Sequence, residues 1–100
     1  MPMQMKFSLK VQSGPEFGKE MILEKPELTL GRDPTNDLVI TDPEVSRHHA
    51  RLVFSGDNYS IEDLGSTNGT FLQGQQIHGL TPLNSRDLIV IGERVILLYE

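Results

Sequence analysis

The sequence predicts an all-β protein, a sandwich or barrel of many short strands. Apolar residues alternate with polar ones over short stretches, which is the period of a strand with one buried face. Clusters rich in glycine, proline, asparagine and aspartate interrupt these stretches about every 8–12 residues, as in sandwiches and barrels. No stretch of useful length follows the helical period, so we expect negligible helix.

The strands follow one another along the whole chain. The stretches with alternating apolar residues are residues 6–12, 28–30, 50–54 and 59–61. Near the end, residues 88–91 and 95–99 are continuously apolar and partly β-branched. We therefore expect these last two strands to be buried more completely than the others.

The interrupting clusters predict hairpins and loops. Residues 55–58 read Ser-Gly-Asp-Asn between two alternating stretches and predict a tight hairpin. Gly92-Glu93 separates the last two apolar runs, and a glycine at the first central position suits a type II′ turn. The clusters that predict longer loops are residues 33–37, 41–43 and 65–69.

Length and composition narrow the possible classes of protein. The chain has 100 residues, and we expect one domain over residues 1–100, excised from or part of a larger protein. The absence of cysteine excludes disulfides and thiolate zinc sites. No apolar run reaches the roughly 20 residues of a membrane-spanning helix, and residues 1–10 lack a secretory signal, so we expect a cytoplasmic protein with no membrane contact.

The distribution of charge points to a small anionic ligand. The net charge of -5 argues against a nucleic-acid partner, because nucleic-acid-binding domains are usually basic. Five of the twelve Lys, Arg and His residues nevertheless fall within residues 32–51. A local basic cluster on an acidic chain suits one small anion better than a long polyanion.

Three polar segments at predicted strand ends carry the candidate chemistry. They are residues 31–32 (Gly-Arg), 46–49 (Ser-Arg-His-His) and 65–70 (Gly-Ser-Thr-Asn-Gly-Thr). Loops at the end of a rigid sandwich are where binding residues usually lie. Together these segments offer two guanidinium groups, several hydroxyls, an amide and glycine-flanked backbone N–H groups, which suit a tetrahedral oxyanion.

Enzymatic, metal-binding and nucleotide-binding interpretations have less support. Ser46 and His49 resemble a nucleophile and base, but no Gly-x-Ser-x-Gly elbow and no orienting acid accompany them. His48 and His49 are adjacent, so in a strand they would point to opposite faces, and His78 is isolated. The glycine-containing loop is not followed by Gly-Lys-Ser/Thr. We expect no catalysis, metal or cofactor, an exposed His48, and a His49 that bonds backbone and braces the loops.

The same segments resemble the forkhead-associated (FHA) domain family. The stretches that carry the resemblance are Leu30-Gly31-Arg32, Val45-Ser46-Arg47-His48-His49-Ala50 and Asp63-Leu64-Gly65-Ser66-Thr67-Asn68-Gly69-Thr70-Phe71. Each piece alone is common, but all three in order within an all-β pattern are specific. The resemblance implies a two-sheet β-sandwich of about 11 short, mostly antiparallel strands. It also implies a signalling module that binds phosphothreonine in a partner protein, monomeric as an isolated domain.

The resemblance assigns roles to individual positions. The residues that would contact the phosphate are Arg32, Ser46, Arg47 and Thr67, with hydroxyl and backbone donors at Ser46 and Thr67. The residue that would bind the main chain of the peptide next to the phosphothreonine is Asn68. The residues that would shape the loops without touching the ligand are Gly31, His49 and Gly69.

Structural roles remain open for several of these residues. Arg32 and Arg47 could be solvated strand-end side chains, Ser46 could begin a strand, and Asn68-Gly69 is a turn signal in its own right. The main alternative function is a phosphate-independent β-sandwich scaffold for intramolecular or homotypic contacts. The resemblance also implies that residues after the phosphothreonine, especially the third, set the specificity, and we hypothesise that acidic residues at that position are disfavoured. The residues that motivate it are Asp33, Asp37, Asp42 and Glu44.

Overall fold

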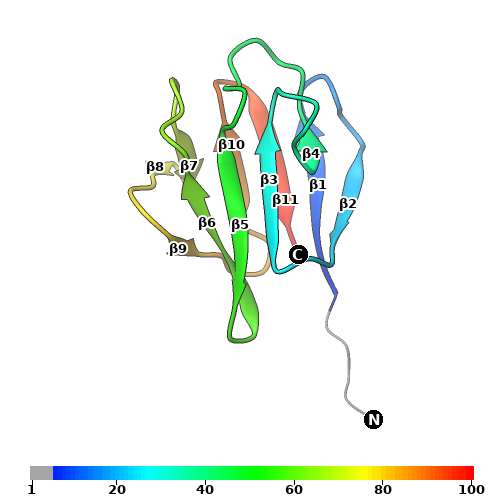
Figure 1. The fold of residues 1–100 in the computed structure, drawn as a ribbon, viewed down its shortest axis with the longest axis vertical. Helices are drawn as coiled ribbons and strands as arrows, with labels where there is room; N and C mark the ends of the chain where they lie inside the picture. The colour runs from blue at the N-terminus through cyan, green and yellow to red at the C-terminus, as the bar shows by residue number, and fades with distance from the viewer. Residues whose placement is uncertain (1–5) are drawn as a thin grey trace.

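A computed structural model describes residues 6–100 of the chain as eleven strands in two sheets (Figure 1). The strands are β1 (Phe7–Ser13), β2 (Glu20–Leu23), β3 (Glu27–Gly31), β4 (Leu38–Val39), β5 (Ala50–Ser55), β6 (Asn58–Asp63), β7 (Thr70–Leu72), β8 (Gln75–Gln76), β9 (Thr81–Pro82), β10 (Leu88–Ile91) and β11 (Val95–Tyr99). Every stretch predicted as a strand is a strand. No helix occurs among these residues, and therefore none that could cross a membrane.

The strand order differs between the two sheets, one with six strands and one with five. The larger sheet has the order β2-β1-β11-β10-β7-β8, so the first long strand pairs with the last, and Leu9 lies opposite Tyr99. The smaller sheet has the order β4-β3-β5-β6-β9. Its β3 and β4 form the one parallel pair among the described strands. The expected two-sheet, mostly antiparallel sandwich is confirmed.

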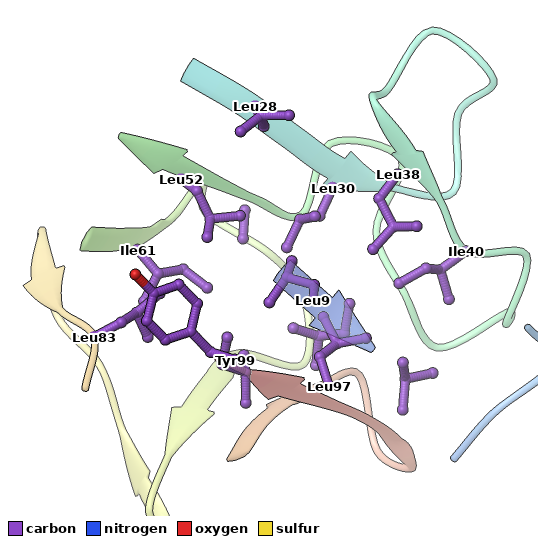
Figure 2. Packing of buried hydrophobic residues seen from close by; sticks show 14 of the residues in the cluster. Leu9, Leu28, Leu30, Leu38, Ile40, Leu52, Ile61, Leu83, Leu97 and Tyr99 are labelled. Carbon is purple, nitrogen blue, oxygen red and sulfur yellow. The ribbon is translucent and has the colours of Figure 1, made fainter. Parts of the chain in front are cut away.

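A single apolar core fills the space between the sheets. Leu9, Leu30, Leu52, Ile61 and Leu97 point into it from five different strands and are fully buried (Figure 2). Leu52, Ile61 and Leu97 each lie between more exposed neighbours, as the two-residue period of a strand requires. Burial of each such side chain contributes about 1.5–3 kcal/mol, which holds the loop-bearing ends of the strands in place.

The expectation of more complete burial is confirmed for β11, which has no exposed residue, but is wrong for β10. Ile89 and Ile91 of β10 are fully buried, whereas Leu88 is 44% exposed. β11 alternates in the same way between buried and half-buried residues. The reason is topological, because the outer face of the larger sheet has no further layer against it, and apolar residues there cover one another across strands. One such cross-strand pair is Leu88 with Leu98.

The two predicted hairpins form, although one has a longer turn than predicted. In the first, Ser55 pairs with Asn58 and leaves two residues in the turn, as expected. In the second, Ile91 pairs with Val95, so three residues form the turn and a two-residue type II′ turn is wrong. Gly92 does have the positive φ of 68° that the sequence suggested. The added residue is Arg94, whose side chain reaches a neighbouring loop described below.

The loops that follow β3, precede β5 and follow β6 lie at the upper end of the sandwich in Figure 1, together with the β10–β11 turn. The opposite end carries the β5–β6 hairpin. The three polar segments identified from the sequence are therefore brought to the same end of the molecule. Their detailed contacts define the candidate site.

Candidate functional site

Arg32 follows directly after β3 and is anchored at one point of its side chain. Its backbone N–H donates to the Ser46 carbonyl at 3.0 Å, and its Nε donates to the Val45 carbonyl at 3.0 Å. Its two Nη groups make no hydrogen bond with any other group among residues 6–100, and the residue is exposed. A guanidinium held at Nε presents its remaining donors to the solvent as a fixed, planar fork.

Gly31 allows the loop that carries Ser46 to pass directly over β3. A Cβ atom at Gly31 would lie 2.1 Å from the Arg47 carbonyl oxygen, closer than any real contact. That oxygen accepts hydrogen bonds from the Asp33 N–H at 3.1 Å and from Asn36 Nδ2 at 2.7 Å. The main chain of Arg47 therefore closes the loop. Sequence reasoning missed Asn36, whose buried amide ties the two segments together.

Ser46 and His49 connect the second polar segment to the third. The Thr67 N–H donates to Ser46 Oγ at 3.0 Å, so the serine hydroxyl keeps its own proton for a further partner. The Ser46 N–H donates to His49 Nδ1 at 3.0 Å, and His49 Nε2 lies 2.8 Å from the Gly69 carbonyl. The backbone N–H groups of Ser46 and Thr67 are thus engaged within the protein, and their hydroxyls are the donors that remain.

The third segment is organised by Asp63, a residue that sequence reasoning also missed. Its carboxylate accepts hydrogen bonds from the Gly65 and Ser66 N–H groups at 3.0 and 2.9 Å, and from the Ser66 and Thr70 hydroxyls at 2.5 and 2.7 Å. Burial by itself would raise the pKa of Asp63, but the bonds from Ser66 and Thr70 outweigh it, so the pKa is lowered. In Asp63-Leu64-Gly65-Ser66 the aspartate stands two residues before a glycine, and an aspartate side chain that bonds the backbone two residues on is a turn signal that could have identified it.

Asn68 lies at the edge of the site and contacts the loop before β5. Its Nδ2 donates to the Glu44 carbonyl oxygen at 2.8 Å and to Glu44 Oε1 at 3.0 Å. Its side-chain oxygen makes no hydrogen bond within residues 6–100 and can accept one from a main-chain N–H of a ligand. Gly69, next to it, has a φ of 88°, and a Cβ there would lie 2.8 Å from Gln76 Nε2. The positive φ explains a glycine at this position, because the flexible end of the Gln76 side chain could move aside for a Cβ.

The acidic residues near the site are not equally available to a ligand. Asp42 is fully buried, and Arg94 Nε donates to it at 2.7 Å, which lowers the pKa of the carboxyl. Asp37 is paired with Lys25 at 2.6 Å. The hypothesis that both help to select ligands is therefore weakened, since their charges are neutralised within the protein. Glu44 forms no ion pair with any of the residues that the structure describes.

The structure thus brings seven of the eight predicted site residues into one hydrogen-bonded or close-packed set. The exception is the side chain of Arg47, which is exposed and makes no hydrogen bond within residues 6–100, although its carbonyl is central to the loop. His48 is exposed, as expected. Within the described part of the chain, no three His, Asp or Glu residues are arranged to hold a metal ion.

The position of His49 predicts a pH-dependent stability. Burial disfavours the charged imidazolium and lowers the pKa of His49 from the ordinary value near 6.5, against the raising effects of Gly69 and Asp63. In addition, Nδ1 accepts the Ser46 N–H and is unprotonated in this arrangement. The unfolded chain therefore binds the proton more readily. The contribution of neutral His49 to the free energy of unfolding is therefore complete above about pH 6.5. It is lost as the pH falls below that value, by at most about 1.4 kcal/mol per pH unit. Urea unfolding at pH 7.5 and 5.5 measures this loss.

Two variants separate this effect from general acid sensitivity. The exposed His78 is a matched control, so His78→Gln is expected to keep the wild-type difference between the two pH values. His49→Gln is expected to be less stable at pH 7.5 but to show a smaller difference. An equal pH dependence in wild type and His49→Gln would contradict the prediction.

The fold and site together define a class of protein: a β-sandwich recognition module whose loop end presents hydrogen-bond donors to an anion. The family model of the FHA domain matches residues 28–92. The chain belongs to the FHA domain family.

Relatives and solved structures agree with this assignment. The glycogen accumulation regulator GarA of Mycolicibacterium smegmatis is 33% identical over 85 residues, which are 85% of this chain and 53% of that protein. The transcriptional regulatory protein EmbR of Mycobacterium tuberculosis is 40% identical over 74 residues, which are 74% of this chain and 19% of that protein. The chain therefore spans about half the length of GarA and a smaller share of EmbR.

Among solved structures, an FHA domain from Chlamydia trachomatis superposes with a TM-score of 0.87 at 33% identity. The match covers 95% of this chain and 96% of that one. Mycobacterium tuberculosis EmbR in complex with a low-affinity phosphopeptide superposes with a TM-score of 0.86, also at 33% identity. That match covers 97% of this chain and 24% of EmbR.

Proposed function

We propose that this domain binds phosphothreonine-containing segments of partner proteins. The observation that carries the proposal is the guanidinium of Arg32, which is anchored through Nε while its Nη groups stay free of other bonds within residues 6–100; the Arg32 main chain bonds to that of Ser46. A bidentate fork and a neighbouring hydroxyl suit the oxygens of a phosphate group. Thr67 and the exposed Arg47 supply further donors at the edge of the same site, and Asn68 holds the peptide main chain.

The expected affinity follows from a small number of strong bonds. A hydrogen bond to a charged group contributes about 1.5–3 kcal/mol net. Three or four of them, less the cost of ordering a flexible peptide, leave about -8 kcal/mol, or a Kd near 1 μM. The preference for phosphothreonine over phosphoserine follows from family membership, with burial of the threonine methyl group contributing about 0.8 kcal/mol.

Two related structures support the ligand class. One is EmbR with its phosphopeptide. The other is a structure described as an analysis of phosphothreonine-dependent FHA domain interactions, which is 25% identical with a TM-score of 0.85 and covers 96% of both chains. The ligand in this proposal is of the same class, a phosphothreonine segment presented by a partner protein.

The proposal also holds that the domain performs no catalysis. In support, His49 Nδ1 faces the backbone N–H of Ser46, so the imidazole is not placed as a base for the serine hydroxyl. We further propose that the domain works in the cytoplasm as part of a longer protein. GarA and EmbR are both longer than the region aligned with this chain, which supports the proposal that the domain is part of a longer protein.

Titration calorimetry with a degenerate peptide library centred on phosphothreonine tests the function. We expect a Kd near 1 μM for the phosphothreonine library. Weaker binding is expected for the phosphoserine library, and no measurable binding for the unphosphorylated one. Phosphate-independent binding, or no binding by a folded protein, would favour the scaffold alternative and reduce the three loops to structural turns.

A further inference from the structure

Glu44 carries a negative charge at the part of the site where the peptide main chain is held. Its Oε1 lies 3.0 Å from Asn68 Nδ2, and its backbone carbonyl accepts a second hydrogen bond from the same amide. These bonds fix the glutamate side chain at Asn68, although both residues are open to solvent to some degree. A carboxylate held there lies within reach of the residues that flank the phosphothreonine.

Glu44 forms no ion pair with any residue in the described part of the chain, although Arg94 lies near enough for the two charges to attract each other. The nearby cation Arg94 is paired with the buried Asp42 at 2.7 Å. Arg32 is bonded through Nε to the Val45 carbonyl and, in the proposed complex, directs its other donors to the phosphate. The site therefore combines a cationic part at Arg32 with an anionic part at Glu44.

From this arrangement we infer that Glu44 selects phosphothreonine segments with a lysine or arginine close to the phosphothreonine. The selected basic residue lies in whichever flank of the peptide, before or after the phosphothreonine, runs past Asn68. The inference rests on the proposed phosphothreonine binding and adds the charge of the neighbouring residue. A basic side chain gains from Glu44, whereas an acidic one is repelled. Because the pair is open to solvent, the preference is about two- to fivefold in Kd, and it weakens as the salt concentration rises.

Alanine-based phosphothreonine peptides test the inference, with Lys, Ala or Glu placed in turn at each of the three positions on either side. For the wild-type protein we expect Lys to bind more tightly than Glu on one side only. Glu44→Gln keeps an oxygen that can accept from Asn68 and removes the charge, so the Lys and Glu peptides are expected to bind alike. Glu44→Lys is expected to reverse the order.

The matched control is Glu24→Gln, which changes the net charge equally but lies in the β2–β3 turn, at the end of the sandwich that carries the β5–β6 hairpin. It is expected to retain the wild-type preference for Lys. Equal binding of Lys and Glu peptides by the wild type, or an unchanged preference in Glu44→Gln, would overturn the inference while leaving phosphothreonine binding in place. Failure of every phosphothreonine peptide to bind would overturn the proposed function itself.

Discussion

Arg32→Ala is expected to weaken binding of a phosphothreonine peptide about 100-fold, because two charge-assisted hydrogen bonds of about 1.5 kcal/mol or more each are lost. The domain itself should remain folded. The side chain is exposed, and its one internal bond, from Nε to the Val45 carbonyl, contributes only about 0.5–1.5 kcal/mol. Calorimetry measures the affinity, and urea unfolding measures the stability of the same sample.

Two further variants show whether the loss comes from the guanidinium fork. Arg32→Lys keeps the positive charge but cannot both bond to Val45 and chelate a phosphate, so we expect it to recover only a minor part of the affinity. Arg86→Ala removes an equal charge from an exposed residue that pairs with Glu100, and it should bind like the wild type. Wild-type affinity in a folded Arg32→Ala protein would disprove the assignment of the phosphate site.

Gly31→Ala is expected to produce the largest loss of stability among these variants, about 2 kcal/mol or more. The added Cβ would lie 2.1 Å from the Arg47 carbonyl oxygen and 2.8 Å from Asn36 Nδ2, so the main chain of the Ser46 loop must move. Because that movement displaces Ser46 from Arg32, phosphopeptide affinity should fall together with stability. Urea unfolding and calorimetry on the same variant measure the two effects.

Gly56→Ala is the matched control for this substitution. Gly56 has a φ of 71°, and a Cβ there meets no atom within 4 Å, so the cost is conformational alone, about 1–2 kcal/mol. It lies in the β5–β6 turn, at the end of the sandwich away from the site, and its affinity should be unchanged. A Gly31→Ala protein as stable as the wild type would contradict the close approach of the Arg47 carbonyl to Gly31.

The strands could be predicted from sequence because their signal is local. Alternating residues such as Leu9 and Val11 report which face of a strand is buried, whatever the strand pairs with. The same reasoning was wrong for β10, where a continuous apolar run was taken to mean more complete burial. Whether a second layer covers the outer face of a sheet is a property of the whole fold. Local composition does not report it.

In the candidate site too, some residues could be predicted from the sequence and others could not. The residues named from the resemblance, from Gly31 to Gly69, are recognisable because their types and order recur in the family. The residues that support them were not recognised. Asp63, Asn36 and the pair Asp42–Arg94 act through hydrogen bonds to main-chain atoms or to residues distant in sequence. Asp42 and Arg94, for example, are separated by 52 positions.

The sequence by itself therefore determined the class of fold, the family and the order of the loops that carry the site. Only the tertiary structure decided which donors remain available, as in the case of Ser46, whose N–H is taken by His49 while its hydroxyl is not. It also decided that Asp42 forms an ion pair with Arg94, whereas Glu44 is bonded to the amide of Asn68. The physical reason is that each polar group bonds to whatever partner the packed strands bring within about 3 Å, and that partner is set by the fold.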